Sequence, residues 1–251
     1  MKDIRLDKYV ASTFNETRSG AKLIIKNKRV EVNGVTNTDP DYKIKETDIV
    51  KIDGKEIKYE ENIYLMMNKP KGYISATTDN RHKTVFDLIK GYNINNLKIV
   101  GRLDIDTTGL LLITTDGDFV HALTSPNKDI YKTYKVLCDK EFTIDDVTSF
   151  KEGITIRLDD ETLYQCKESK LEILENKKEA LISIREGKFH QIKKMCKAVG
   201  KEVLELKRIS IGPLVLDETL EEGKIRPLTE EERELFKWFY MSTVPKVKIA
   251  P

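Results

Sequence analysis

The chain has 251 residues, of which 39% are hydrophobic and 34% charged, and its formal net charge is +2. This length allows one or two globular domains, and the composition suits a protein with real hydrophobic cores. No apolar run approaches the roughly 18–20 residues that cross a bilayer, and the N-terminus lacks a signal-peptide apolar region, so neither a membrane span nor secretion is expected. Three scattered cysteines predict reduced thiols and a cytoplasmic location.

Charge is unevenly distributed along the chain. Residues 1–30 hold eight Lys or Arg against three Asp or Glu, and residues 185–208 repeat that balance. Two basic patches on a near-neutral protein are typical of polyanion binding, although solvated Lys-rich faces explain the charge alone equally well. Residues 217–234 hold eight acids against three bases, and we interpret them as a solvated helix and its approach.

The first 58 residues predict two helices. Leu6, Val10 and Phe14 recur at helical spacing, which predicts a helix over residues 5–14. A second helix is predicted to begin near Ser19. The two helices are short, so they need further elements to complete a core.

Two short strands are predicted to follow these helices. Residues 29–32 alternate and meet Asn33-Gly34, a strong hairpin signal, and residues 49–52 alternate and end at Asp53-Gly54. The polar residues 55–62 are expected to form a linker. Residues 1–58 are therefore predicted to be a compact module, too small to be a robust fold alone but plausible as an appended domain.

The remaining chain is predicted to be strand-rich. A larger domain is expected over residues 63–240, followed by a loose tail over residues 241–251 with two prolines and little apolar pattern. Helices are predicted near residues 84–90, 117–124, 143–150, 190–199 and 229–239.

The N-terminal module resembles the S4-type RNA-binding domain. The resemblance depends on "RLDKYVASTF" followed by "TRSGAKLIIKNKRVEVNG". In that family two helices present basic side chains to structured RNA, where phosphate contacts position the domain without reading much sequence. The resemblance implies RNA contacts by the basic residues Arg5, Lys8, Arg18, Lys22, Lys26, Lys28 and Arg29.

The stretch "GRLDIDTTGLLLITTDGD", residues 101–118, places two carboxylates on a turn before a buried strand. Asp104, Asp106 and Gly109 fit positions 1, 3 and 6 of a calcium loop. However, Thr108 is a poor fifth ligand, Thr115 stands where the loop needs Glu, and the flanks are typical of strands rather than helices. With three His and no Cys-x-x-Cys, a structural zinc site is not expected either.

Turn bracing is the second interpretation of these carboxylates. Asp and Thr side chains bond nearby backbone N–H groups, and Gly adopts backbone angles that other residues avoid. We favour this interpretation for Asp106, Thr107 and Thr108. For Asp104, the residue pattern alone leaves both bracing and chemistry open.

The same stretch resembles the catalytic motif of pseudouridine synthases, in the family of the ribosomal small-subunit synthase A and its large-subunit relatives. Four further segments resemble that family in the same order, and with the S4-like module the resemblance covers nearly all of residues 1–240. It implies an α+β fold whose catalytic domain has a mixed, largely antiparallel sheet flanked by helices. The four segments are "LMMNKPKGYISAT" (65–77), "ALTSPNKDIYKTYKV" (122–136), "REGKFHQIKKMCKAVG" (185–200) and "LKRISIGPLVLDETLEEGKIRPLTEEE" (206–232).

The resemblance implies three catalytic residues and no cofactor or metal. Asp104 would attack the ribose carbon or take a proton beside it while uracil departs. An ionised carboxylate in a pocket that excludes water needs a neighbouring cation, and the matching position is Lys193. Tyr134 would lie against the uracil ring. Without the resemblance, Lys193 would be interpreted as part of a solvated helix face and Tyr134 as an ordinary strand aromatic residue.

The resemblance also implies RNA contacts near the catalytic residues. Arg102 would fill the gap that the flipped nucleotide leaves in the stacked RNA; without the resemblance it would be interpreted as part of a surface salt bridge. His190, Gln191 and Lys194 would contact RNA as well.

The form of the motifs indicates the target. Lys193-Lys194-Met195 and the full "GRLDIDTTGL" resemble the small-subunit branch, which implies action on one uridine of 16S rRNA (position 516), either free or in a partly assembled small subunit. Nothing in the sequence suggests an obligate dimer, so a monomer is expected. A 23S rRNA synthase and a non-catalytic RNA-binding assembly factor remain as alternatives. The joint presence of Asp104, Tyr134 and Lys193 argues against the second.

Overall fold

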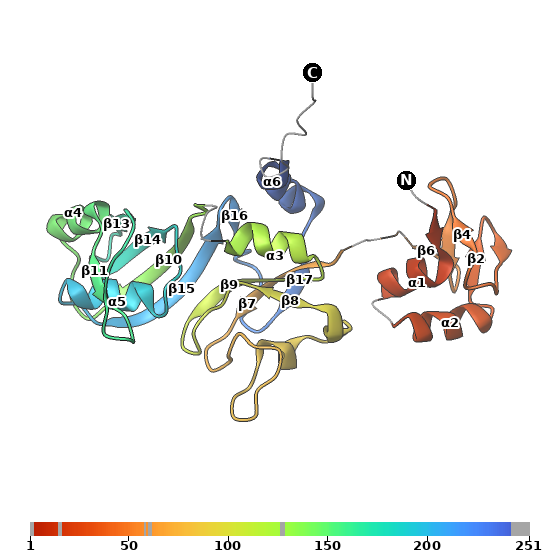
Figure 1. The fold of residues 1–251 in the computed structure, drawn as a ribbon, viewed down its shortest axis with the longest axis horizontal. Helices are drawn as coiled ribbons and strands as arrows, with labels where there is room; N and C mark the ends of the chain where they lie inside the picture. The colour runs from red at the N-terminus through yellow and green to blue at the C-terminus, as the bar shows by residue number, and fades with distance from the viewer. Residues whose placement is uncertain (1–2, 15–16, 58, 60–61, 126–128, 242–251) are drawn as a thin grey trace, which may run out of the picture. The chain divides into compact units, whose positions relative to one another are not determined.

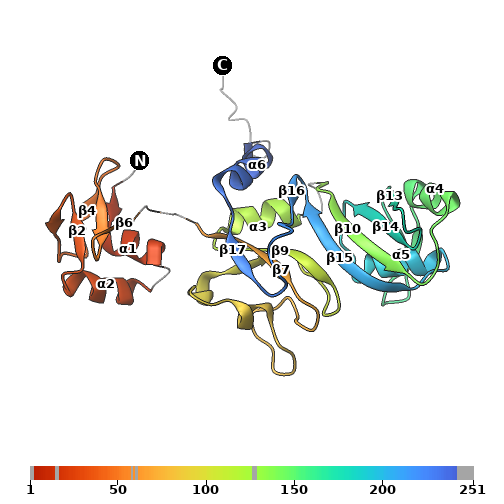
Figure 2. The same ribbon diagram turned by 180° about the vertical axis from the view of Figure 1, so that it is seen from behind.

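The computed structural model describes residues 3–14, 17–57, 59, 62–125 and 129–241. It divides into two compact units, residues 1–63 with 89–97, and residues 64–88 with 98–251 (Figures 1 and 2). The tail predicted over residues 241–251 lies outside the described residues except for Met241. The domain limits 1–58 and 63–240 remain predictions.

The N-terminal unit contains both predicted helices and both predicted strands. Thr17 caps the second helix by accepting a hydrogen bond from the Gly20 amide, and the predicted Asn33-Gly34 hairpin joins β2 to β3. A four-stranded sheet has the order β3-β2-β5-β6, and β1 pairs with β4. The elements are β1 (Ile4–Arg5), α1 (Leu6–Phe14), α2 (Arg18–Lys26), β2 (Val30–Val32), β3 (Val35–Thr36), β4 (Lys43–Ile44), β5 (Val50–Ile52) and β6 (Lys55–Ile57).

The linker predicted over residues 55–62 is wrong at its beginning. Residues 55–57 form β6, which pairs with β5 as an antiparallel hairpin. Asp53 and Gly54 have φ angles of 49° and 78°, so both occupy the left-handed region that a two-residue hairpin turn requires. The Asp-Gly pair therefore joins two strands rather than ending the module.

The second unit is built on one large sheet. Its order is β13-β14-β10-β15-β9-β7-β17, with β16 paired to β15 and β8 paired to β9. Among the named strands of the described chain, β9 with β15 is the one parallel pair, which confirms a mixed, largely antiparallel sheet. The strands are β7 (Tyr64–Lys69), β8 (Lys98–Val100), β9 (Thr108–Thr114), β10 (Lys132–Cys138), β11 (Thr155–Arg157), β12 (Leu163–Gln165), β13 (Lys170–Ile173), β14 (Glu179–Ile184), β15 (Val203–Ile211), β16 (Leu214–Val215) and β17 (Ile225–Pro227).

Four of the five helices predicted for this part of the chain are present as α-helices beside the sheet. The fifth, predicted near 84–90, is a single 3₁₀ turn, Val85–Leu88. The Asp87 carboxylate accepts a hydrogen bond from the Thr84 amide, so the segment closes on itself after one turn. A second 3₁₀ turn spans Ile94–Asn96. The α-helices are α3 (Gly117–Thr124), α4 (Ile144–Glu152), α5 (Gln191–Ala198) and α6 (Glu230–Met241).

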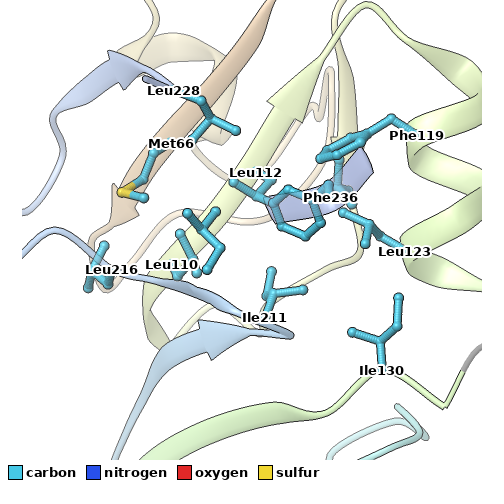
Figure 3. Packing of buried hydrophobic residues seen from close by; sticks show 12 residues of the cluster. Met66, Leu110, Leu112, Phe119, Leu123, Ile130, Ile211, Leu216, Leu228 and Phe236 are labelled. Carbon is cyan, nitrogen blue, oxygen red and sulfur yellow. The ribbon is translucent and has the colours of Figure 1, made fainter. Parts of the chain in front are cut away.

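The hydrophobic core beside residues 101–118 joins β7 and β9 to α3 and α6 (Figure 3). Leu110 and Leu112 of β9 face Phe119 of α3 and Phe236 of α6. The two phenylalanine rings meet edge to face with centroids 5.1 Å apart, a favourable geometry. This packing fixes β9, and with it the loop that precedes β9.

The two halves of the sheet meet through a very short contact. β9 and β15 pair only at Thr108 with Lys207 and at Gly109 with Arg208. Gly109 has a φ of +98°, and a Cβ atom there would lie 2.2 Å from the Arg208 carbonyl oxygen, so a side chain cannot fit. Successive strand partners then form one row across the sheet, Lys69–Gly109–Arg208–Tyr134.

Candidate active site

A cavity of about 830 Å³ opens in the second unit beside this row. Its walls include residues 101–105 and Thr107, residues 184–192, and side chains of β10 and β15. The structure brings together five of the residues that the sequence predicted, all of which line this cavity: Arg102, Asp104, Tyr134, His190 and Gln191. Tyr134 is only 8% exposed, whereas Arg102 is exposed.

The loop before β9 positions Asp104 through its backbone. The Asp104 carbonyl oxygen accepts hydrogen bonds from the Thr107 amide at 3.1 Å and from the Lys69 ammonium at 2.9 Å. The Asp104 side chain is 26% exposed. Its carboxylate is therefore held at the cavity without being shut off from it.

Lys69 is a site residue that the sequence analysis missed. It is fully buried at the end of β7 and also donates to the Thr107 carbonyl oxygen at 2.8 Å. Burial lowers the pKa of Lys69 to about 8, and the charges of Asp106 and Asp104 oppose that shift. The sequence signal that could have identified this residue is a lysine at the end of a strand that begins with the apolar run Leu65–Met67.

Lys193 lies between two carboxylates rather than beside one. Its ammonium is 3.4 Å from Asp104 Oδ2 and 2.5 Å from Asp106 Oδ1. Burial acts to raise the pKa of Asp106, but the Lys193 ammonium outweighs it and holds that pKa below its usual value. The favoured interpretation of Asp106 as a turn brace therefore missed the ammonium partner of its carboxylate, Lys193 of α5.

His190 is the second cation-capable group near Asp104. Its Nε2 atom is 3.6 Å from Asp104 Oδ2. Its backbone has a φ of 54°, unusual for a residue other than glycine, and its ring stacks on Phe189 with centroids 3.8 Å apart. Strained residues of this kind cluster at functional sites.

Gln191 and Lys194 have protein partners in the structure. The side-chain Nε2 atom of Gln191 donates a hydrogen bond to Glu186 Oε1 at 2.6 Å. Its Oε1 atom accepts a hydrogen bond from the backbone amide of Lys188 at 2.9 Å. Lys194 pairs with Asp159 at 2.7 Å. These bonds hold the beginning of α5 in place at the cavity wall. RNA contact by Gln191 or Lys194 remains a prediction.

The basic residues of the N-terminal unit fall into two groups. Arg5 pairs with Asp7 at 2.8 Å and with Asp41, and Arg29 pairs with Asp53 at 2.5 Å. Lys8 lies over the Tyr59 ring at 5.7 Å. Like Lys8, the exposed side chains of Arg18, Lys22, Lys26 and Lys28 form no ion pair with a carboxylate among the described residues. RNA contact by any of the seven remains a prediction.

The described residues offer neither a metal site nor a membrane-spanning helix. No group of three His, Cys, Asp or Glu side chains is arranged there to hold a metal ion. None of the helices in the same part of the chain is long and apolar enough to cross a membrane.

The fold and the cavity match one class of enzyme. The profile of the S4 domain matches residues 4–50, and that of the RNA pseudouridylate synthase family matches residues 63–198. The chain therefore belongs to the RNA pseudouridylate synthase family, and it is an RNA-modifying isomerase with an S4 domain.

Individual relatives extend over almost the whole chain. It is 40% identical over 229 residues to the ribosomal small subunit pseudouridine synthase A of Vibrio cholerae, covering 91% of this chain and 97% of the relative. It is 40% identical over 242 residues to an uncharacterized RNA pseudouridine synthase of Bacillus subtilis, and the match covers 92% of this chain and 98% of that relative. A crystal structure of a pseudouridylate synthase matches with a TM-score of 0.65 and 36% identity, covering 92% and 98%.

Proposed function

We propose that this enzyme isomerises one uridine of 16S rRNA, at position 516, to pseudouridine, with Asp104 as the residue that starts the reaction. The observation that carries the proposal is the Asp104 carboxylate at the cavity, fixed through its backbone and flanked by Lys193 and His190. The name of the Vibrio cholerae relative supports the small-subunit target.

The proposed chemistry exchanges one bond for another. Asp104 attacks ribose C1′ or removes a proton beside it, and the bond from C1′ to uracil N1 breaks as the base departs. The base rotates within the cavity and C5 bonds to C1′, which breaks the bond from C1′ to Asp104 or, on the second route, is accompanied by return of the sugar proton from Asp104. C5 then loses its proton, and N1 gains one. The net change is an isomerisation, so the reaction consumes no co-reactant.

Each neighbouring residue has a distinct part in this proposal. Lys193, 3.4 Å from Asp104, balances the negative charge of that carboxylate when RNA covers the cavity and excludes water. Tyr134 lies against the uracil ring and assists removal of the C5 proton. Arg102, exposed at the cavity, enters the gap that the flipped nucleotide leaves.

In this proposal the S4 domain contributes affinity for RNA and takes no part in the chemistry. Its exposed lysines contact phosphates of 16S rRNA or of a partly assembled small subunit, which positions the cavity over the target. We further propose that the enzyme works as a monomer in the cytoplasm.

Tritium release separates the proposed target from its alternatives. Transcripts of 16S and 23S rRNA labelled with tritium at uridine C5 are each incubated with the purified protein. We expect release from the 16S transcript and background release from the 23S transcript. Release only from 23S rRNA would identify a large-subunit enzyme, and release from neither RNA in any assembly state would favour a binding factor.

A further inference from the structure

Three cationic side chains on the sheet wall of the cavity have no part in the chemistry above. They are Lys132 of β10, Arg185 just after β14, and Arg208 of β15, and all three line the cavity. Arg208 is 1% exposed; its Nε donates to the Leu110 carbonyl oxygen at 2.7 Å, but its Nη2 has no hydrogen-bond partner among the described residues. The buried Nε of Arg185 also lacks a partner there.

The charge of this group is not balanced by acids. Arg185 forms one ion pair within the described part of the chain, a long one with Glu168 at 3.9 Å, and its charge also acts on Asp129. Within the described part of the chain, neither Lys132 nor Arg208 forms an ion pair with a carboxylate. Burial and the neighbouring charge of Arg208 lower the pKa of Lys132, which shows two like charges held close together. A buried cation without a partner costs free energy, so such a group is suited to an anion that completes it.

The three cations lie around Tyr134. Arg208 is the strand partner of Tyr134, and Lys132 lies two residues before it on β10, on the same face of the strand. Lys132 in turn pairs with Ile184, the neighbour of Arg185. A uracil ring placed against Tyr134 would therefore have this cationic group beside it.

Of the groups that an RNA brings into the cavity, the phosphate has a permanent negative charge. Uracil is neutral when it enters, so it cannot balance two or three cations in the bound ground state. We propose that Lys132, Arg185 and Arg208 form a phosphate-binding subsite inside the cavity, for the backbone phosphate of the nucleotide whose base lies against Tyr134. The identity of that nucleotide rests on the proposed function. The subsite anchors the flipped nucleotide and so orients its ribose toward Asp104.

Mononucleotide binding tests this subsite without depending on turnover. Uridine 5′-monophosphate and uridine are each titrated into the full-length protein, and binding is followed by chemical shifts of backbone amides. We expect the monophosphate to bind about tenfold more tightly than uridine, as bonds to a charged acceptor predict. We expect Lys132→Met and Arg185→Met each to reduce that ratio to about threefold or less. The matched control is Lys151→Met, an exposed lysine of α4 that does not line the cavity.

Three results would overturn the subsite. The first is a ratio near one in the unmodified protein. The second is a ratio that neither cavity variant lowers, or that Lys151→Met lowers equally, with all variants folded by their amide spectra. The third is an equal loss of uridine and monophosphate binding in Lys132→Met, which would mean that the group contacts the base or sugar. Failure to turn over 16S rRNA would refute the proposed function and leave this binding result unchanged.

Discussion

The two ends of α5 each present a lysine to carboxylates, but in different surroundings. Near the first turn, Lys193 contacts Asp104 and Asp106, and the three side chains are 23%, 26% and 49% exposed beside the cavity. Beyond the last turn, Lys201 pairs with Asp146 at 2.7 Å, and both side chains are 8% exposed. Asp146 also accepts hydrogen bonds from the amide and hydroxyl of Thr143, which caps α4.

This difference separates an ion pair that we propose to serve chemistry from one that serves the fold. The Asp146 pair is buried and its carboxylate is saturated by partners, so it has no capacity left for a ligand. The Asp104 carboxylate is half-buried, shares its lysine with Asp106, and faces a cavity large enough for a nucleotide. Changes at the first end of α5 should therefore alter rate, and changes at the second should alter stability.

The largest expected effect is at Asp104. Asp104→Asn preserves the size of the side chain but removes its charge, so we expect turnover to fall by about a thousandfold or more. Tritium release from C5-labelled RNA measures it, and RNA affinity should be largely retained because the S4 domain is unchanged. Asp118→Asn, at an exposed position of α3, is the matched control. Substantial turnover by Asp104→Asn would assign the chemistry to another residue.

Lys193 should show the next largest effect. Lys193→Met removes the cation beside Asp104, and we expect a loss of about a hundredfold in the single-turnover rate. Lys193→Arg keeps the charge with a different geometry, and we expect a loss of about tenfold. Unfolding in urea should change little in either variant. Equal rates for the Met and Arg variants would contradict a role for the charge.

At the other end of α5, Lys201→Met should destabilise the fold. Removing one partner leaves Asp146 buried and unpaired, which costs about 3 kcal/mol in the free energy of unfolding. Urea titration measures this loss, while the single-turnover rate of the folded protein at low temperature should stay within about twofold. A large loss of rate in the folded variant would contradict the division between the two ends.

The stability effect of Lys201→Met should depend on pH. Burial acts to raise the pKa of Asp146, but the bonds from Lys201 and Thr143 hold it below its usual value. Because the folded-state pKa is depressed, the stability that Asp146 contributes is present above its unfolded value of about 4 and lost as pH falls through the folded value. The difference in stability between the unmodified protein and Lys201→Met should therefore narrow below about pH 4.

The smallest expected effect distinguishes the two groups of basic residues in the S4 domain. Replacing both Lys22 and Lys26 with Gln should lower the slope of log affinity against log salt by about one to two units, because each lost phosphate contact removes up to about one. Replacing Arg5 and Arg29 with Gln should change the slope less, because Asp7 and Asp53 already pair with them. Equal slopes for the two double variants would mean that these ion pairs open on RNA.

Local patterns predicted the elements that depend on local chemistry. The helical spacing of apolar residues predicted α1, and the apolar residues after Gly109 predicted the buried strand β9. The turn at Asp53-Gly54 was recognised, but not the strand after it, because "KEI" has no apolar alternation of its own and gains its pairing from β5. Such a strand is stabilised by its partner rather than by its sequence.

The same distinction holds for the site. Asp104 and Tyr134 lie in segments long enough to resemble a family, so they were predicted. Lys69 and Arg208 also lie in segments that resemble the family, but they were missed because their roles depend on distant partners, the carbonyl oxygens of Asp104 and Leu110. The Lys193–Asp106 bond likewise joins residues 87 positions apart, and no local pattern selects one carboxylate over the other.

The central claim is that Asp104 makes one pseudouridine in 16S rRNA. Its most direct test is a map of pseudouridines in 16S and 23S rRNA from cells that lack the gene, complemented with the unmodified gene or with the Asp104→Asn gene. We predict that a single 16S pseudouridine, at position 516, disappears on deletion, returns with the unmodified gene, and stays absent with Asp104→Asn. Its return with Asp104→Asn, or a loss confined to 23S rRNA, would contradict the account.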